Sequence, residues 1–182
     1  MDIHLQSTNY NTMKIRNLKP QSVKVLKIFH IFFSFSWVIG SLALCLLIFI
    51  TYPESGDTLY LRSRILQIID DYFIISGALG AFFTGLIYSI WTNWGFFKHP
   101  WIIVKWIMTI LQILFGTFVL GPCINDNVLI ADQLRDVALT DPIVLNNIQT
   151  TQILGTTQAS LLLFIVIISV LKPWKRKKAK TN

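Results

Sequence analysis

Residues 72–97, "YFIISGALGAFFTGLIYSIWTNWGFF", contain no Asp, Glu, Lys or Arg and are almost entirely apolar. A helix crosses the core of a bilayer with roughly 20 apolar residues, so this stretch is long enough to span a membrane. Uncharged windows of the same kind cover residues 28–53, 106–125 and 142–171. Because a backbone in lipid must satisfy its own hydrogen bonds, these windows predict four helices and an all-α integral membrane four-helix bundle.

The composition also favours a membrane protein over a soluble domain. Of the 182 residues, 53% are hydrophobic and only 14% are charged, whereas a soluble domain carries about a quarter of its residues as charged ones. The net charge of +7 would suggest a nucleic-acid partner in a soluble chain. Here the positive residues gather at the edges of the apolar windows, so we expect the bilayer as partner and no nucleic acid.

The distribution of Lys and Arg predicts the orientation in the membrane. Basic residues precede the first window and follow the last one, and Lys98 lies in the short connection between the second and third windows. The charged residues of segment 126–141, by contrast, are four Asp and one Arg. By the positive-inside rule we expect a multi-pass cell-membrane protein with both termini and residue 98 in the cytoplasm, and with residues 54–58 and 123–151 outside.

The same pattern sets the expected domain boundaries. Residues 1–22 are interpreted as a flexible cytoplasmic arm, residues 23–174 as the transmembrane domain, and residues 175–182 as a basic cytoplasmic tail. In the outer loop 123–151, apolar residues recur at helical spacing, so we expect a short amphipathic helix lying over the outer face of the bundle. The transmembrane helices are expected at about 23–51, 61–94, 100–121 and 153–171.

Two local pairings are considered near the outer interface. The acidic residues 70–71 lie one to two helical turns beyond Arg62 and Arg64, which could pair with them. Cys45 and Cys123 are interpreted as separate thiols, with a bridge left open because it would need Cα atoms within about 7 Å.

A stripe of small residues marks the second helix: Gly77, Ala81, Gly85 and Ser89 recur every four residues. Such a stripe lets another backbone approach closely, so packing against a neighbouring helix is the first interpretation. A slot for a flat cofactor is the alternative. The stripe could also serve contact with a second copy of the chain or with a membrane partner.

Three candidate site residues, His30, His99 and Lys105, lie toward the expected cytoplasmic side of the helices, and a fourth, Trp37, is expected near mid-membrane. His30 and Trp37 share one face of the first helix, while His99 and Lys105 lie at the start of the third. Ionisable groups inside a membrane are functional candidates by default. A neutral imidazole is a common axial ligand of b-type haem, and haem propionates are anions that a lysine can pair with. In the structural alternative, His30 only forms a hydrogen bond to a neighbouring helix, and the Lys105 side chain extends back to the lipid headgroups.

Three short motifs carry a resemblance to a known superfamily: "HIFFSFSWVIG" (30–40), "WIIVK" (101–105) and "SVLKPW" (169–174). The chain resembles the small membrane proteins that include HemJ-type protoporphyrinogen oxidases and CopD-type membrane domains, and overall it looks like a group of four-helix bacterial membrane proteins. The resemblance implies His30 as an axial haem ligand and Lys105 as a propionate partner. Residues 146–155, "NNIQTTQILG", stand where the HemJ type carries an Arg-x-x-Asn-Glu-x-Pro signature, so cofactor binding is carried over rather than the oxidation reaction.

Two functional hypotheses remain open after the sequence alone. The first is a membrane protein that binds haem b or a porphyrin near the cytoplasmic side and has a redox role, with His30, Trp37, Lys105 and His99 as cofactor-binding residues. The second is a non-catalytic four-helix membrane protein, an accessory or structural subunit, without a cofactor. Catalytic residues and enzymatic activity stay unassigned.

Overall fold

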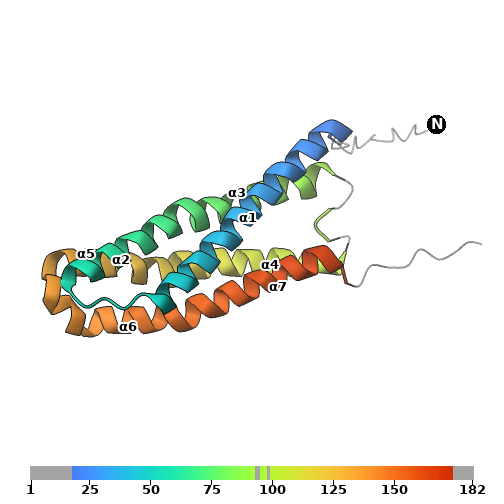
Figure 1. The fold of residues 1–182 in the computed structure, drawn as a ribbon. Helices are drawn as coiled ribbons and strands as arrows, with labels where there is room; N and C mark the ends of the chain where they lie inside the picture. The colour runs from blue at the N-terminus through green and yellow to red at the C-terminus, as the bar shows by residue number, and fades with distance from the viewer. Residues whose placement is uncertain (1–17, 93–94, 98, 174–182) are drawn as a thin grey trace, which may run out of the picture.

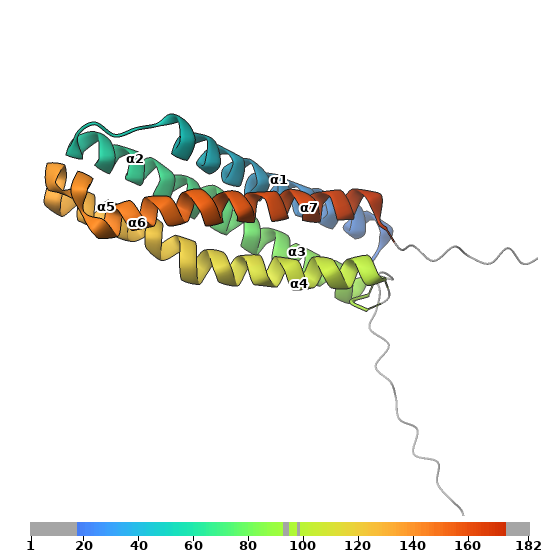
Figure 2. The same cartoon turned by 90° about the horizontal axis from the view of Figure 1, so that it is seen from below.

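The computed structural model describes residues 18–92, 95–97 and 99–173. Across these ranges the chain is helical and forms no strand. Four long helical rods lie side by side in antiparallel order (Figure 1 and Figure 2). The prediction of an all-α four-helix bundle is therefore confirmed. Most of the expected arm, Lys98 and the basic tail 175–182 lie outside the described residues.

The first rod is the single helix α1 (Pro20–Ile50). Each of the other rods contains a short π-helical segment between two α-helices, and the third also ends in a turn of 3-10 helix. The second rod consists of α2 (Gly56–Ile69), η1 (Asp70–Ile75) and α3 (Ser76–Trp91); the third of α4 (Pro100–Phe115), η2 (Gly116–Leu120), α5 (Gly121–Leu134) and η3 (Arg135–Thr140); the fourth of α6 (Pro142–Thr150), η4 (Thr151–Gly155) and α7 (Thr156–Leu171).

The bundle has two distinct ends. We call the end that holds the start of α1, the connection from α3 to α4 and the end of α7 the tail end, and the opposite end the turn end (Figure 1). All four rods are long and apolar enough to cross a membrane. The backbone turns at Arg135 (φ 51°), so the continuous part of the third rod runs from α4 to the end of α5 at Leu134. At 1.5 Å per residue this part is about 52 Å long, well beyond the roughly 30 Å core of a bilayer.

The third rod does not end where we expected. The sequence "GPC" at residues 121–123 suggested a helix end near residue 121, but the helix runs through Pro122 into α5. The segment η2 lies directly before the proline, and the Gly121 nitrogen donates to the Gly116 carbonyl, five residues back. A proline has no N–H to donate in a helix interior. The wider π-helical spacing before Pro122 lets the helix continue without that hydrogen bond.

The outer segment 123–151 likewise differs from the expected loop. Instead of a short helix lying over the outer face, α5 extends the third rod and packs along α2, and the chain turns at Asp141 directly into α6. The helical spacing was predicted correctly in part: Val128, Ala131 and Ala138 are buried, whereas Leu134 and Val137 are exposed. The apolar face of this segment packs against neighbouring helices of the same bundle. The sequence of the segment alone does not identify these neighbours.

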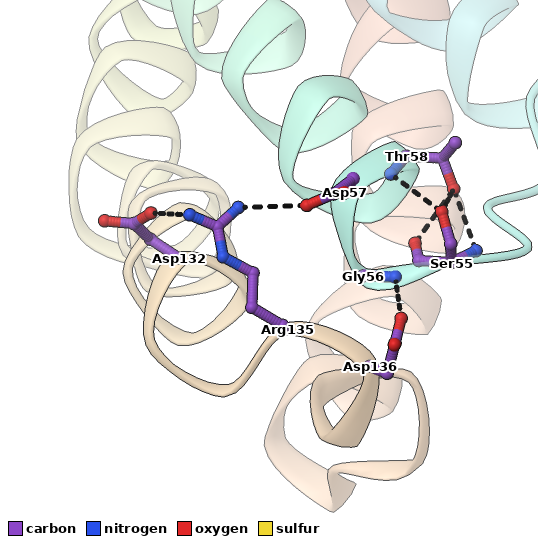
Figure 3. Close-up of polar contacts among 7 residues, drawn as sticks. All are labelled: Ser55, Gly56, Asp57, Thr58, Asp132, Arg135 and Asp136. Carbon is purple, nitrogen blue, oxygen red and sulfur yellow. Dashed lines mark hydrogen bonds and ion pairs between the residues drawn. The ribbon is translucent and has the colours of Figure 1, made fainter.

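The second rod begins at Gly56, five residues before the expected Leu61, because its start is capped twice. Ser55 and Thr58 form a capping box, in which the Ser55 side chain accepts from the Thr58 nitrogen. The Gly56 nitrogen donates to Asp136 Oδ1 over 2.6 Å. As Figure 3 shows, the neighbouring Arg135 joins the same junction, with ion pairs to Asp57 at 3.3 Å and to Asp132 at 2.8 Å. The start of α2 is thus fastened to the turn after α5.

Candidate functional site

His30 lies in α1 at a contact with α3. Its Nδ1 is 2.9 Å from the Thr84 hydroxyl oxygen, and that hydroxyl donates its only hydrogen to the Gly80 carbonyl at 2.6 Å. With the Thr84 hydrogen on the Gly80 carbonyl, the arrangement favours the tautomer in which Nδ1 donates to the Thr84 oxygen. The lone pair of the ring then lies on Nε2, and a histidine binds a metal through such an unprotonated nitrogen.

The small residues of α3 are covered by α1. A Cβ on Gly77 would lie 2.6 Å from the Trp37 backbone nitrogen, and a Cβ on Gly80 would meet the Phe33 ring at 2.3 Å. The His30 ring lies beside Gly85, where an added Cβ would make an ordinary contact of 3.4 Å. The stripe thus serves close helix packing, as first interpreted. The alternative of a flat cofactor slot does not hold at Gly77 and Gly80, because Phe33 and the α1 backbone occupy this space.

Lys105 lies in the second turn of α4 and is half-buried. Ion pairs among the described residues all involve Arg135, so no carboxylate neutralises Lys105 there. The next residue, Trp106, connects α4 to α3: its indole N–H donates to Ser89 at 3.3 Å, and its ring meets Phe82 edge-on. His30 in α1 and Lys105 in α4 both lie toward the tail end of their helices.

Trp37 and His99 have other surroundings. Trp37 is buried in the core between helices, where it packs with Ala78, Ala81 and Leu162. His99 precedes Pro100 at the start of α4, and its ring stacks on Trp101 with 6.2 Å between ring centroids. These packing contacts do not test a ligand role for either residue, and the proposal below is built on the polar side chains of His30 and Lys105.

The donors that His30 and Lys105 supply can be compared with what a bare metal ion and a haem each require. Within the part of the chain that the structure describes, no group of three or more His, Cys, Asp or Glu side chains could hold a metal. A haem needs only one or two axial ligands from the protein, because its ring supplies the other nitrogens. His30 offers one such nitrogen, and Lys105 offers a cation for an acidic substituent.

A second polar group in the interior, at the turn end, was not predicted. Arg62, Ser63, Asn127, Asn147 and Thr151 are all buried there. The Asn147 amide donates to Asn127 Oδ1 at 3.2 Å, and the Thr151 hydroxyl donates to the Asn147 carbonyl. Asn147 and Thr151 lie four residues apart inside an uncharged window, which is the pattern that could have revealed them.

Arg62 does not pair with the acidic residues 70–71, contrary to expectation. Its Nε donates to the Thr51 hydroxyl at 2.9 Å, and its NH2 group to the Ile48 carbonyl at 3.2 Å. Arg64 instead donates to the Gln67 side chain on the outside of the helix. The two arginines therefore point to different sides of α2. Cys45 and Cys123 are both free thiols.

Comparison with protein-family models, with curated proteins and with solved structures finds no match to this chain.

Proposed function

We propose that this chain is a multi-pass membrane protein, with both termini in the cytoplasm, that binds haem or a porphyrin near the tail end of the bundle. The four long apolar rods support the membrane location. The proposed orientation rests on the Lys and Arg residues, which gather at the ends of the chain and in the connection from α3 to α4.

The state of His30 is the observation that carries the proposal. With its Nδ1–H held by Thr84, the ring keeps a lone pair on Nε2. A metal-bound histidine usually donates its other ring N–H in this way, and such a bond fixes the orientation of the ring. In the proposed complex His30 ligates the iron and Lys105 pairs with a propionate. A bound haem would supply one-electron redox chemistry, which is the proposed role of the protein.

The second candidate function is a structural membrane subunit without a cofactor. It is favoured by the tight packing of α1 on α3, because the His30–Thr84 hydrogen bond also joins these two helices. In this case the bond acts as a clamp, and Lys105 extends along apolar surface toward the headgroups. Contact with another copy or a membrane partner would then use a face of the second rod other than the small-residue stripe, which α1 covers.

Optical spectra of the purified protein separate the two candidates. The chain is produced with added haem precursor, purified in mild detergent and measured for a Soret band per folded protein. We expect a band in the parent protein, its loss in His30→Ala, and a reduced band in Lys105→Met. Lys27→Met is the matched control, because this exposed lysine lies one turn before His30 in α1, so the variant removes the same charge from the same end of the bundle.

The proposal predicts that Lys27→Met keeps the parent spectrum. A parent protein that stays colourless after incubation with haem, and whose His30→Ala variant only melts earlier, would show that the structural function is correct. Equal spectra for the parent and Lys105→Met would remove the lysine from the site and leave His30 alone.

A further inference from the structure

Arg62 is a buried cation without a counter-charge in its surroundings. Only 8% of the residue is exposed. Among the described residues, the ion pairs join Arg135 to Asp57 and to Asp132, and none involves Arg62. A guanidinium stays protonated in proteins, so the charge is taken into the interior. Burying a charge costs much free energy unless it is paired and hydrogen-bonded, which leaves Arg62 in need of a negative partner.

The contact with α1 meets part of this need. The Ile48 carbonyl that accepts from Arg62 lies in the last turn of α1, where the helix dipole is negative. Thr51 accepts a second bond from Nε. These two bonds use only some of the guanidinium donors, and a helix terminus carries a fraction of one charge. Capping of α1 therefore explains the position of Arg62, but some N–H donors of the guanidinium and part of its positive charge remain without a partner.

A small cavity lies directly against Arg62. Its polar lining comes from Arg62 and Ser63 of α2, Asn127 of α5 and Thr151 of η4, with apolar side chains such as Ile48 and Leu66 around them. The cavity has room for about one water-sized particle. No Asp or Glu lines it. The space therefore suits a particle of atomic size rather than a phosphate group or an organic acid.

The hydrogen-bond donors around the cavity complement a negative ion. Asn127 uses its oxygen to accept from Asn147, so its NH2 group is left as a donor. Ser63 is 3% exposed and brings a hydroxyl. Together with the unused N–H groups of Arg62, the lining combines one full positive charge with neutral donors and contains no competing carboxylate.

We propose that this cavity binds a small monovalent anion of the size of chloride, held by Arg62 with Ser63 and Asn127. The site lies toward the turn end, far along the bundle from His30, and it does not depend on the binding of haem. The anion neutralises Arg62 where α1, α2, α5 and η4 meet, so it also holds these four segments together.

Chloride NMR line width tests this site directly. The full chain in detergent is titrated with sodium chloride, and the excess line broadening over empty micelles is followed, with bromide, formate and phosphate as competitors. Arg62→Gln should weaken binding by at least about tenfold, because bonds to a charged group are lost. Arg64→Gln is the matched control, since Arg64 lies on the same helix and bonds Gln67 on the outside.

The choice of variants keeps the result clear if Arg62→Gln does not fold. Ser63→Ala retains the arginine and removes one donor, and it should weaken chloride binding several-fold. Bromide should displace chloride, whereas formate and phosphate should not. Broadening equal to that of empty micelles, broadening unchanged in Ser63→Ala, or equal losses in the Arg62 and Arg64 variants would each overturn the proposal. Displacement by phosphate alone would assign the site to a phosphate group instead.

Discussion

The backbone nitrogen of Trp37 in α1 occupies the space in which a side chain on Gly77 of α3 would begin. A Cβ built on Gly77 would lie only 2.6 Å from that nitrogen. At Gly85, two turns further along α3, the neighbour is the edge of the His30 ring at 3.4 Å. At Gly77 the two helices are therefore in direct backbone contact, whereas at Gly85 the His30 side chain lies between them.

Gly77→Ala should destabilise the bundle, whereas Gly85→Ala should be tolerated. The alanine at 77 must push α1 away from α3, and overpacking of this kind costs about 1–3 kcal/mol. The alanine at 85 fits with a small shift of the imidazole. Thermal unfolding of both variants in the same detergent measures the difference. Equal midpoints would mean that α1 and α3 do not meet at Trp37.

Asp136→Ala should loosen the start of α2. The Asp136 carboxylate accepts from the Gly56 nitrogen, so it places a negative charge at a helix N-terminus. Loss of such a cap costs about 1 kcal/mol. Asp132→Ala is the control, because its ion pair with Arg135 is exposed and worth little. Amide hydrogen exchange in the first turn of α2 should speed up in the first variant only.

The proposed orientation predicts which end of the bundle impermeant reagents reach in intact cells. Tyr52 at the turn end and Gln21 near the tail end are both exposed. In a background without Cys45 and Cys123, Tyr52→Cys should react with an impermeant maleimide, whereas Gln21→Cys should react only after permeabilisation. The reverse labelling pattern would show that the protein has the opposite orientation in the membrane.

Thr84→Val should separate a cofactor role of His30 from a clamp role. The variant keeps the shape of the side chain and removes the acceptor for Nδ1–H. In the proposed haem complex, binding should weaken by about tenfold or more, as for other bonds that orient metal ligands. Stability should fall by only about 1 kcal/mol. Thr157→Val is the control, since Thr157 is exposed and bonds only its own helix. A change in melting with unaltered haem binding would identify a clamp.

The sequence was sufficient for properties that repeat along a single helix. Uncharged windows marked all four rods, because each rod contains a stretch that is long and apolar enough to cross a membrane. The inward face of α4 follows the same kind of pattern: Trp101, Thr109 and Gln112 recur at helical spacing, and all three are buried. Likewise, the spacing of small residues in α3 indicated a close helix contact, which the structure places against α1.

Helix ends and the partners of polar residues depended on the tertiary structure. Pro122 is a helix breaker by local rules, but the π-helical segment before it lets the third rod continue. Arg62 precedes the acidic residues 70–71 in sequence, yet helix phase turns it toward the end of α1. Whether a polar group finds a carboxylate, a carbonyl or a cavity is decided by neighbours distant in sequence. Only the packing of the rods brings Ile48, Asn127 and Thr151 around that arginine.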